Sequence, residues 1–331
     1  MAQENHHVPR MLWCLPEAFV DAPALRPRLE RFASVDVRRP AQAELASIVR
    51  YYDILVPRLS HEVNESMLDS APSLKLIGTP STGSDHIAVA AAKRRGIETV
   101  TLKDDRAFLD SIQATAELAW LLILACHRRF REALDQVERG QWNAQDVRGH
   151  ELMGRTLGIV GYGRLGTMVA RFAQAFCMRV IATDPFVTIR DPGVKQLPLE
   201  QLLVEADIIS LHVHLSDSTR GLIGPREFTL MKHGAVLVNT SRGSVINEEA
   251  LLKALREGKL AAAGLDVIQG ERSTDRASRP LLAYAANHRN LIITPHIGGF
   301  TQESQIKAHG RFVELLEQAW AQRAGPAHLT P

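Results

Sequence analysis

Cysteine is scarce in this chain, and the few cysteines form no motif. Cys14, Cys126 and Cys177, the three that are present, stand far apart in the sequence. Zinc sites and redox-active dithiols require closely spaced thiols, so the sequence predicts neither, and it predicts no other metal site. The thiols are instead expected to be buried or free, in a protein of a reducing compartment.

An excess of charge of one sign is also missing. The formal net charge of the 331-residue chain is +2, so the basic footprint of a nucleic-acid-binding protein is lacking and no such partner is expected. A hydrophobic content of 45% and a charged content of 23% are ordinary for a globular protein. This length predicts about two domains, each able to bury its own core.

Long hydrophobic runs are absent too. The longest, residues 118–126, lies between Glu117 and Arg128 and is too short to span a bilayer. Residues 1–10 are polar and lack the basic, apolar and small-residue order of a signal peptide. The sequence therefore predicts a cytoplasmic protein with no membrane partner.

The strongest positive signal is a glycine-rich turn after a short apolar run. Residues 156–160 are strand-like, and Gly161, Gly163 and Gly166 follow them with Gly-x-Gly-x-x-Gly spacing. The first glycine permits a tight turn, the second lets backbone approach a pyrophosphate, and the third lets a helix pack on the strand. The N-terminus of that helix offers free N–H groups and a positive dipole end to phosphates.

An acidic residue completes this pattern. A second apolar run, residues 180–183, ends in Asp184. Its carboxylate can accept hydrogen bonds from the adenosine ribose hydroxyls and would repel the 2′-phosphate of NADP. The sequence therefore predicts a bound dinucleotide, NAD rather than NADP. The alternative is a plain strand–helix turn whose glycines only save space.

Strand-like and helix-like segments alternate along most of the chain. Such alternation predicts an α/β fold, in which helices cover both faces of parallel sheets. Residues 111–138 are predicted to form one long helix, and residues 302–322 the last helix. Because this last helix follows the dinucleotide segment, we expect the chain to return to its first domain, crossing near residues 100–103 and 295–299. The predicted strands are residues 11–15, 35–37, 53–56, 74–78, 97–100, 157–160, 180–183, 207–211, 235–239, 261–267 and 291–294.

Three polar residues follow late strands. Arg242 and His296 come directly after strand-like runs, and Glu271 lies five residues past Asp266 at another strand end. The carboxyl ends of strands border the ligand crevice in open α/β sheets, so all three could face a bound nicotinamide. Taken singly, each has a plainer interpretation as a surface arginine, a solvated loop carboxylate and a structural histidine. Together with the glycine turn they indicate a catalytic site.

The chemistry of these three residues suits the reduction of a 2-keto acid. The fork of Arg242 can hold carboxylate and carbonyl oxygens together. His296 can give a proton in reduction and take it in oxidation, while Glu271 beside it would favour the imidazolium and fix its orientation. Two other functions stay open: oxidation of formate or phosphite on the same scaffold, and an NADH-sensing co-regulator. Formate oxidation releases no hydroxyl proton, so Glu271 weighs against that version.

These motifs resemble the D-isomer-specific 2-hydroxy-acid dehydrogenase family over about residues 50–315. The resemblance implies two doubly wound parallel-sheet domains: a flavodoxin-like substrate domain of residues 1–103 and 297–331, and an inserted Rossmann NAD-binding domain of residues 104–296. It implies an enzyme that interconverts a D-2-hydroxy acid and its 2-keto acid, and a homodimer joined through the NAD-binding domain. The matching stretches are residues 78–87, 116–120, 158–166, 239–243, 264–267 and 294–299.

The resemblance also assigns roles to residues. It implies that Arg242, Glu271 and His296 are catalytic, and that backbone amides around Ser81, Thr82 and Gly83 hold the substrate carboxylate. It assigns cofactor binding to Arg164 and Leu165 by the pyrophosphate, to Asp184 by the ribose, to Thr240 and Asp266 beside the nicotinamide, and to Gly298 and Gly299.

Three further positions concern the substrate pocket. Arg58 follows a strand of the first domain and is a candidate contact for a distal acidic group of the substrate, with a surface salt bridge as the alternative. The family often has proline after the catalytic glutamate, whereas this chain has Arg272. Phe300 stands where a smaller residue or another aromatic is usual, and it could narrow the pocket or pack between domains.

Overall fold

The computed structural model describes residues 8–271 and 279–324. The chain forms two compact units, Ile112–Phe300 and a unit made of Met1–Ser111 with Thr301–Pro331. The boundaries expected from the sequence, before residue 104 and after residue 296, fall a few residues N-terminal to these. Within the described residues, no helix combines the length and apolar character needed to cross a lipid bilayer.

The first unit is built on a five-stranded parallel sheet with the order β2-β1-β3-β4-β5. This is the strand order of flavodoxin-like folds, as expected. Strands β3 and β4 are buried at every position, which follows from helices covering both faces of a parallel sheet. The strands are β1 (Arg10–Trp13), β2 (Ser34–Val37), β3 (Ile54–Val56), β4 (Leu76–Gly78) and β5 (Glu98–Val100).

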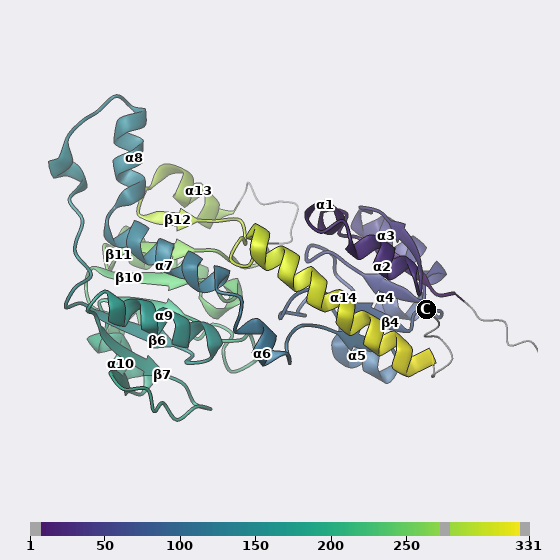
Figure 1. Ribbon diagram of the computed structural model, residues 1–331. Helices are drawn as coiled ribbons and strands as arrows, with labels where there is room; N and C mark the ends of the chain where they lie inside the picture. Colours follow the sequence, from purple (N-terminus) through teal and green to yellow (C-terminus); the bar gives the residue numbers. More distant parts are fainter. Residues whose placement is uncertain (1–7, 272–278, 325–331) are drawn as a thin grey trace, which may run out of the picture. The chain divides into compact units, whose positions relative to one another are not determined.

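Helices cover this sheet on two sides. On one face α3 (Gln42–Ile48), α4 (Glu65–Asp69) and α5 (Val89–Arg94) share a core with alternate strand residues. On the other face the last helix, α14 (Gln302–Ala324), packs on β4 and β5 and beside α1 (Glu17–Asp21) and α2 (Leu25–Glu30) (Figure 1). The C-terminal helix therefore completes the core of the unit in which the chain begins.

A close contact fixes α14 on the sheet. The Phe312 ring is fully buried, with its centroid 6.0 Å from that of Trp13 on β1. A Cβ added to Gly78 at the end of β4 would lie 2.5 Å from the same ring. The helix thus packs on bare backbone at this point.

The second unit has a seven-stranded parallel sheet with the order β12-β11-β10-β9-β6-β7-β8. The chain enters at β6, winds outward to β8, and returns to add β9 on the other side of β6. This reversal between β6 and β9 is the point where dinucleotide-binding sheets take their ligand. The strands are β6 (Thr156–Val160), β7 (Arg179–Thr183), β8 (Val194–Gln196), β9 (Ile208–Leu211), β10 (Ala235–Asn239), β11 (Leu260–Leu265) and β12 (Leu291–Ile293).

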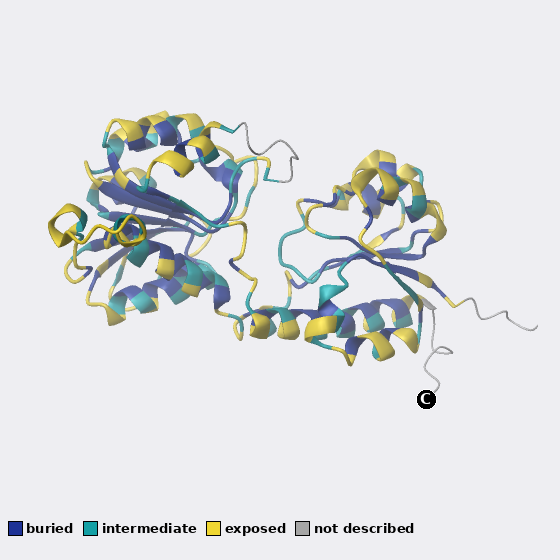
Figure 2. Ribbon diagram, turned by 90° about the horizontal axis from the view of Figure 1, so that it is seen from above, coloured by how far each residue is buried: buried dark blue, intermediate teal, exposed yellow. Residues whose placement is uncertain are grey.

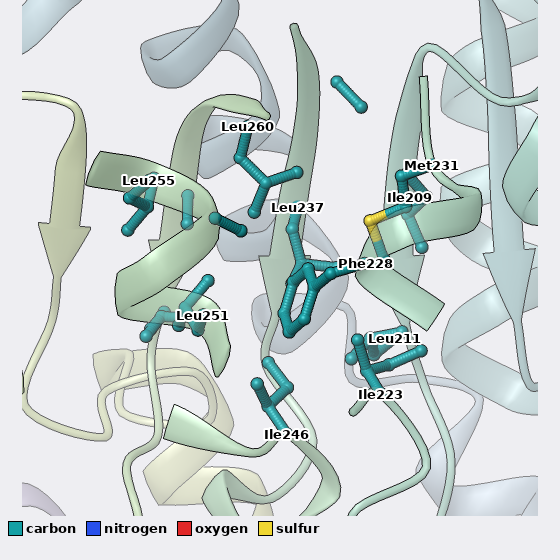
Figure 3. Close-up of a cluster of buried hydrophobic side chains, with 14 of the residues drawn as sticks. Ile209, Leu211, Ile223, Phe228, Met231, Leu237, Ile246, Leu251, Leu255 and Leu260 are labelled. Atoms are coloured by element: carbon teal, nitrogen blue, oxygen red, sulfur yellow. The ribbon is translucent and has the colours of Figure 1, made fainter. Parts of the chain in front are cut away.

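Helices again form two outer layers. Helices α7 (Ala114–His127) and α9 (Arg164–Ala175) cover one face, and four helices cover the other. Figure 3 shows part of the core between the sheet and these four helices, where Phe228, Leu237 and Leu251 gather. The strands of both sheets are largely buried, and the exposed residues lie mainly on helices and loops (Figure 2). The four helices are α10 (Leu199–Glu205), α11 (Pro225–Leu230), α12 (Glu248–Arg256) and α13 (Pro280–Asn287).

The α/β fold class is confirmed, but the single helix predicted over residues 111–138 is wrong. The structure has α7 and a separate α8 (Phe130–Glu138), because Arg129 takes the left-handed φ of 51°. The cause is a tertiary contact at the end of α7. Gly149 packs so closely there that a Cβ on it would lie 2.7 Å from Arg128 Cα. The His150 N–H also donates to the His127 carbonyl, 3.0 Å away, at the end of α7.

We expect Phe312→Ala to lower the free energy of unfolding of the first unit by about 3–5 kcal/mol, because a fully buried ring is lost and a cavity remains. The measurement is urea-induced unfolding followed by circular dichroism. Ile306→Ala, on the same helix but 38% exposed, is the control and should cost much less. Equal losses for the two variants would contradict the packing described for α14.

Candidate active site

The glycine turn after β6 is shaped by backbone contacts. Gly161 has φ of 94°, and a Cβ on it would lie 2.7 Å from the carbonyl oxygen of His212. A Cβ on Gly166 would overlap the carbonyl oxygen of Gly161, so α9 packs directly on the turn. A Cβ on Gly163 would meet nothing within 4 Å, so open space lies beside the first turn of α9. Free N–H groups of that turn border a space suited to phosphate.

Asp184, directly after β7, is tied to this turn. Its Oδ2 accepts the N–H of Tyr162 at 2.8 Å, and its Oδ1 accepts the N–H groups of Phe186 at 2.8 Å and Val187 at 3.1 Å. A carboxylate has about four acceptor positions, so Oδ2 keeps one for a further hydrogen-bond donor. The carboxylate is thus held beside the glycine turn and can accept one more hydrogen bond.

The two other residues assigned to the pyrophosphate lie in the first turn of α9. Arg164 extends its guanidinium toward the start of the unit, where Nη1 donates to the carbonyl of Ile112 at 2.6 Å. Leu165 is half-buried and packs on the core shared by α7 and α9. The contribution of these two residues to phosphate binding stays a prediction.

Two buried polar atoms lie just after β9 and β10, the two strands that follow β6 toward β12 in the sheet. Within the described residues, Thr240 Oγ1 after β10 and His212 Nδ1 after β9 have no hydrogen-bond partner. Burial lowers the pKa of His212 to about 4, so its imidazole is neutral, and its Nε2 lies 2.8 Å from Ser210 Oγ. Unsatisfied buried groups cost about 1–3 kcal/mol each, which a ligand with hydrogen-bonding groups would offset. Sequence reasoning missed His212, whose one signal was its place after a strand.

His296 lies in a loop held by one buried carboxylate. Asp266 is 2% exposed, and its oxygens accept hydrogen bonds from Thr294 Oγ1 at 2.6 Å, Ile297 N at 2.8 Å and Gly298 N at 2.7 Å. His296 has the left-handed φ of 57°, and its N–H donates to the Asp266 carbonyl at 2.9 Å. Asp266 therefore fixes the loop on both sides of the imidazole. Nicotinamide contacts of Asp266, Gly298 and Gly299 stay predictions.

The imidazole and a carboxylate meet across this edge of the sheet. His296 Nδ1 and Glu271 Oε1 are 2.7 Å apart. When Nδ1 is the donor, Nε2 is left to exchange a proton with a ligand. His296 is partly exposed, so the ring is accessible. The structure thus brings together two of the three residues expected to be catalytic.

Arg242 follows β10 at the same carboxyl edge as the loops after β11 and β12. Its Nη1 donates to the carbonyl of Ser241 at 2.8 Å, and its own carbonyl accepts from Asn239 Nδ2 at 2.9 Å. The buried Asn239 side chain also accepts the N–H and hydroxyl of Ser241, which shapes the turn before Arg242. The convergence of Arg242 with the imidazole stays a prediction.

The residues expected to hold the substrate lie in the first unit. After β4, Ser81 Oγ bonds to the Gly83 carbonyl at 2.7 Å, while the N–H groups of Thr82 and Gly83 have no acceptor in the described part of the chain. Two such donors in one loop suit a carboxylate. Arg58 follows β3, and its N–H bonds to His61 Nδ1 at 3.2 Å. The roles of this loop and of Arg58 stay predictions.

Comparisons with known proteins identify the fold and cofactor. Residues 120–298 match the family model described as "D-isomer specific 2-hydroxyacid dehydrogenase, NAD binding domain". The chain is 39% identical over 275 residues to the hydroxypyruvate reductase of Thermotoga maritima (83% of this chain, 86% of the relative). It is 37% identical over 291 residues to a glyoxylate reductase of Thermococcus litoralis, with 84% of each covered.

A solved structure agrees. The D-lactate dehydrogenase of Aquifex aeolicus, complexed with NAD and lactic acid, superposes with a TM-score of 0.84 at 28% identity, over 95% of this chain and 96% of that one. NAD is therefore the cofactor, as the sequence predicted. The open space at Gly163, the spare acceptor of Asp184 and the unpartnered Thr240 Oγ1 fit this cofactor.

We expect Asp184→Ala to shift cofactor preference toward NADPH. Loss of the carboxylate removes an acceptor for the ribose hydroxyls and a charge that repels a 2′-phosphate. The ratio of kcat/KM for NADH to that for NADPH should fall about tenfold or more, equivalent to about 1.4 kcal/mol. Glu200→Ala, which removes an exposed carboxylate on α10, is the control. An unchanged ratio in Asp184→Ala would refute the assignment.

Proposed function

The chain belongs to the D-isomer-specific 2-hydroxyacid dehydrogenase family and is an NAD-dependent oxidoreductase of 2-hydroxyacids, and we propose that its acid–base pair is His296 with Glu271. The supporting observation is the 2.7 Å contact between His296 Nδ1 and Glu271 Oε1. It lies at the carboxyl edge of the sheet that carries the glycine turn. We propose further that Arg242 binds the carboxylate and carbonyl of the substrate.

Each protein group has one task in this scheme. The Arg242 fork holds a 2-keto acid by its carboxylate and polarises the carbonyl. His296 Nε2 gives its proton to the carbonyl oxygen, and Glu271 stabilises the imidazolium before that transfer. When bound, NADH supplies the hydride that reduces the keto carbon. In the direction of oxidation, His296 takes the hydroxyl proton back.

We also propose a role for the amides of the loop after β4. The N–H groups of Thr82 and Gly83 donate to the substrate carboxylate in this proposal. Arg58 contacts a distal acidic group when the substrate has one. The His296–Glu271 contact weighs against formate as the substrate, because formate oxidation has no hydroxyl proton to transfer.

The test is NADH oxidation at 340 nm with glyoxylate, hydroxypyruvate, pyruvate, phosphohydroxypyruvate and bulkier 2-keto acids. We expect turnover with at least one of them, and His296→Ala should slow it by roughly 10²–10⁴-fold because the proton donor is lost. Exposed His233→Ala is the matched control and should leave the rate unchanged. NADH binding without turnover on any acid would favour a sensor, and full activity in His296→Ala would remove its proposed role.

We also propose a homodimer joined through the NAD-binding unit. Phe130, Leu134 and Val137 form an exposed apolar stripe along α8, and Trp142 in the segment after it is 91% exposed. Figure 1 shows α8 projecting from its own sheet. Apolar side chains gathered in this way are normally covered by a partner surface.

Sedimentation velocity tests this assembly. We expect a mass twice that of the 36.6 kDa chain, and Leu134→Glu should shift it toward the monomer because a charge would be buried in the interface. Leu59→Glu replaces an equally exposed leucine of the first unit and should leave the mass unchanged. A wild-type protein that sediments as a monomer would rule the dimer out.

A further inference from the structure

The segment that carries Glu271 lies directly against the segment that begins at Arg242. A Cβ added to Gly243 would overlap the backbone of Ile268 and Gln269, so only glycine allows this approach. The two segments follow neighbouring strands, β10 and β11. The backbone leading to Glu271 is therefore packed on the backbone that follows Arg242.

Gln269 fastens these two segments together. Its side-chain Nε2 donates to the Ile246 carbonyl at 2.6 Å, and its backbone N–H donates to Glu248 Oε1, also at 2.6 Å. Its own carbonyl accepts a hydrogen bond from the Arg279 guanidinium. Two of these bonds cross from the Glu271 segment to residues 246–248. Gln269 thus anchors this segment two residues before the carboxylate that meets His296.

Glu248 is the other half of this anchor. It is half-buried at the start of α12, and burial raises the pKa of its carboxyl group, while the Gln269 N–H and the positive charge of Arg279 act in the opposite direction. Partial burial of a carboxylate is unfavourable unless hydrogen bonds or charges compensate it. Its neighbour Glu249 is exposed, and within the described residues no hydrogen bond joins it to Gln269. Glu248 therefore does more than complement the dipole of α12, as Glu249 also can: it also accepts the N–H of Gln269.

A turn joins Gln269 to Glu271. Gly270 takes the left-handed φ of 51°, a conformation that side chains disfavour, and Glu271 follows this turn to reach His296 at 2.7 Å. The next residue is Arg272, where the family often has proline, and it lies outside the described residues. The hydrogen bonds of Gln269 hold the start of the turn that carries Glu271.

We propose that Gln269, anchored by Glu248, is a positioning residue that holds the Glu271 carboxylate against His296. The inference rests on the proposed acid–base role of that pair. Gln269 touches neither the imidazole nor the reacting atoms. It acts by fixing where Glu271 lies, and a displacement of about 1 Å is enough to lower a rate by up to about 100-fold.

Gln269→Met is the principal test, because methionine keeps the length of the side chain and loses its hydrogen bond to Ile246. We expect kcat for 2-keto acid reduction to fall about 10–100-fold, while KM for the acid and the affinity for NADH, measured by fluorescence, change less than about twofold. Gln269→Glu should behave alike, since its carboxylate faces the Ile246 carbonyl. Intact NADH binding shows that each variant is folded. Unchanged kcat in both variants would overturn the proposal.

Glu248→Ala tests the second half of the anchor against its neighbour. We expect Glu248→Ala to lower kcat in the same direction as Gln269→Met, because the backbone N–H of Gln269 loses its acceptor. Glu249→Ala removes an acid from the same helical turn and should leave kcat unchanged. Equal losses in the two alanine variants would assign the effect to the helix and not to the anchor.

A double-mutant cycle separates this inference from the proposed function. If Gln269 acts through Glu271, then adding Gln269→Met to Glu271→Gln should lower kcat less than about twofold further. The same 10–100-fold loss in both backgrounds would show that Gln269 acts elsewhere. A Glu271→Gln variant with the wild-type rate would refute the acid–base role itself. A slow Glu271→Gln with a normal Gln269→Met would refute only the positioning role.

Discussion

The carboxylate of Asp266 sets the geometry of the edge where the candidate catalytic groups lie. It is buried, and its three hydrogen bonds fix the backbone on both sides of His296. A left-handed conformation at a residue other than glycine costs about 1–2 kcal/mol, and hydrogen bonds to a charged group contribute about 1.5–3 kcal/mol each, so the bonds outweigh the strain. The imidazole can therefore stand in a conformation that its own backbone disfavours.

Both sides of the second sheet combine close backbone packing with carboxylates that accept loop N–H groups. Around β6 and β7, Gly161 and Gly166 bring backbone within contact distance of backbone, and Asp184 accepts loop N–H groups. Around β10 to β12, Gly243 makes the close backbone contact, and carboxylates again accept loop N–H groups. A site for a dinucleotide needs open backbone for phosphates, whereas proton transfer needs side chains held at hydrogen-bonding distance. The same two restraints therefore serve both tasks.

The sequence predicted the parts of this structure that depend on local spacing. The glycine turn, Asp184, the parallel sheets and the strand ends that carry Glu271 and His296 all follow from short motifs or alternation. The break at Arg129 was not predictable, because no glycine or proline marks it. Its cause is the close packing of Gly149, a residue distant in the sequence. The contact of Gln269 with Glu248 was missed for the same reason, since it joins loops that only the folded sheet brings together.

The packing of α14 on the first sheet has a consequence for how the protein is made. Ribosomes synthesise chains from the N-terminus, and domains generally fold as units as they emerge. The continuous second unit, Ile112–Phe300, is complete before the helix that covers Trp13 and Gly78 has been translated. The part of the first sheet that α14 covers therefore stays exposed to solvent until the whole second unit has been translated, so the first unit reaches its final packing after the second.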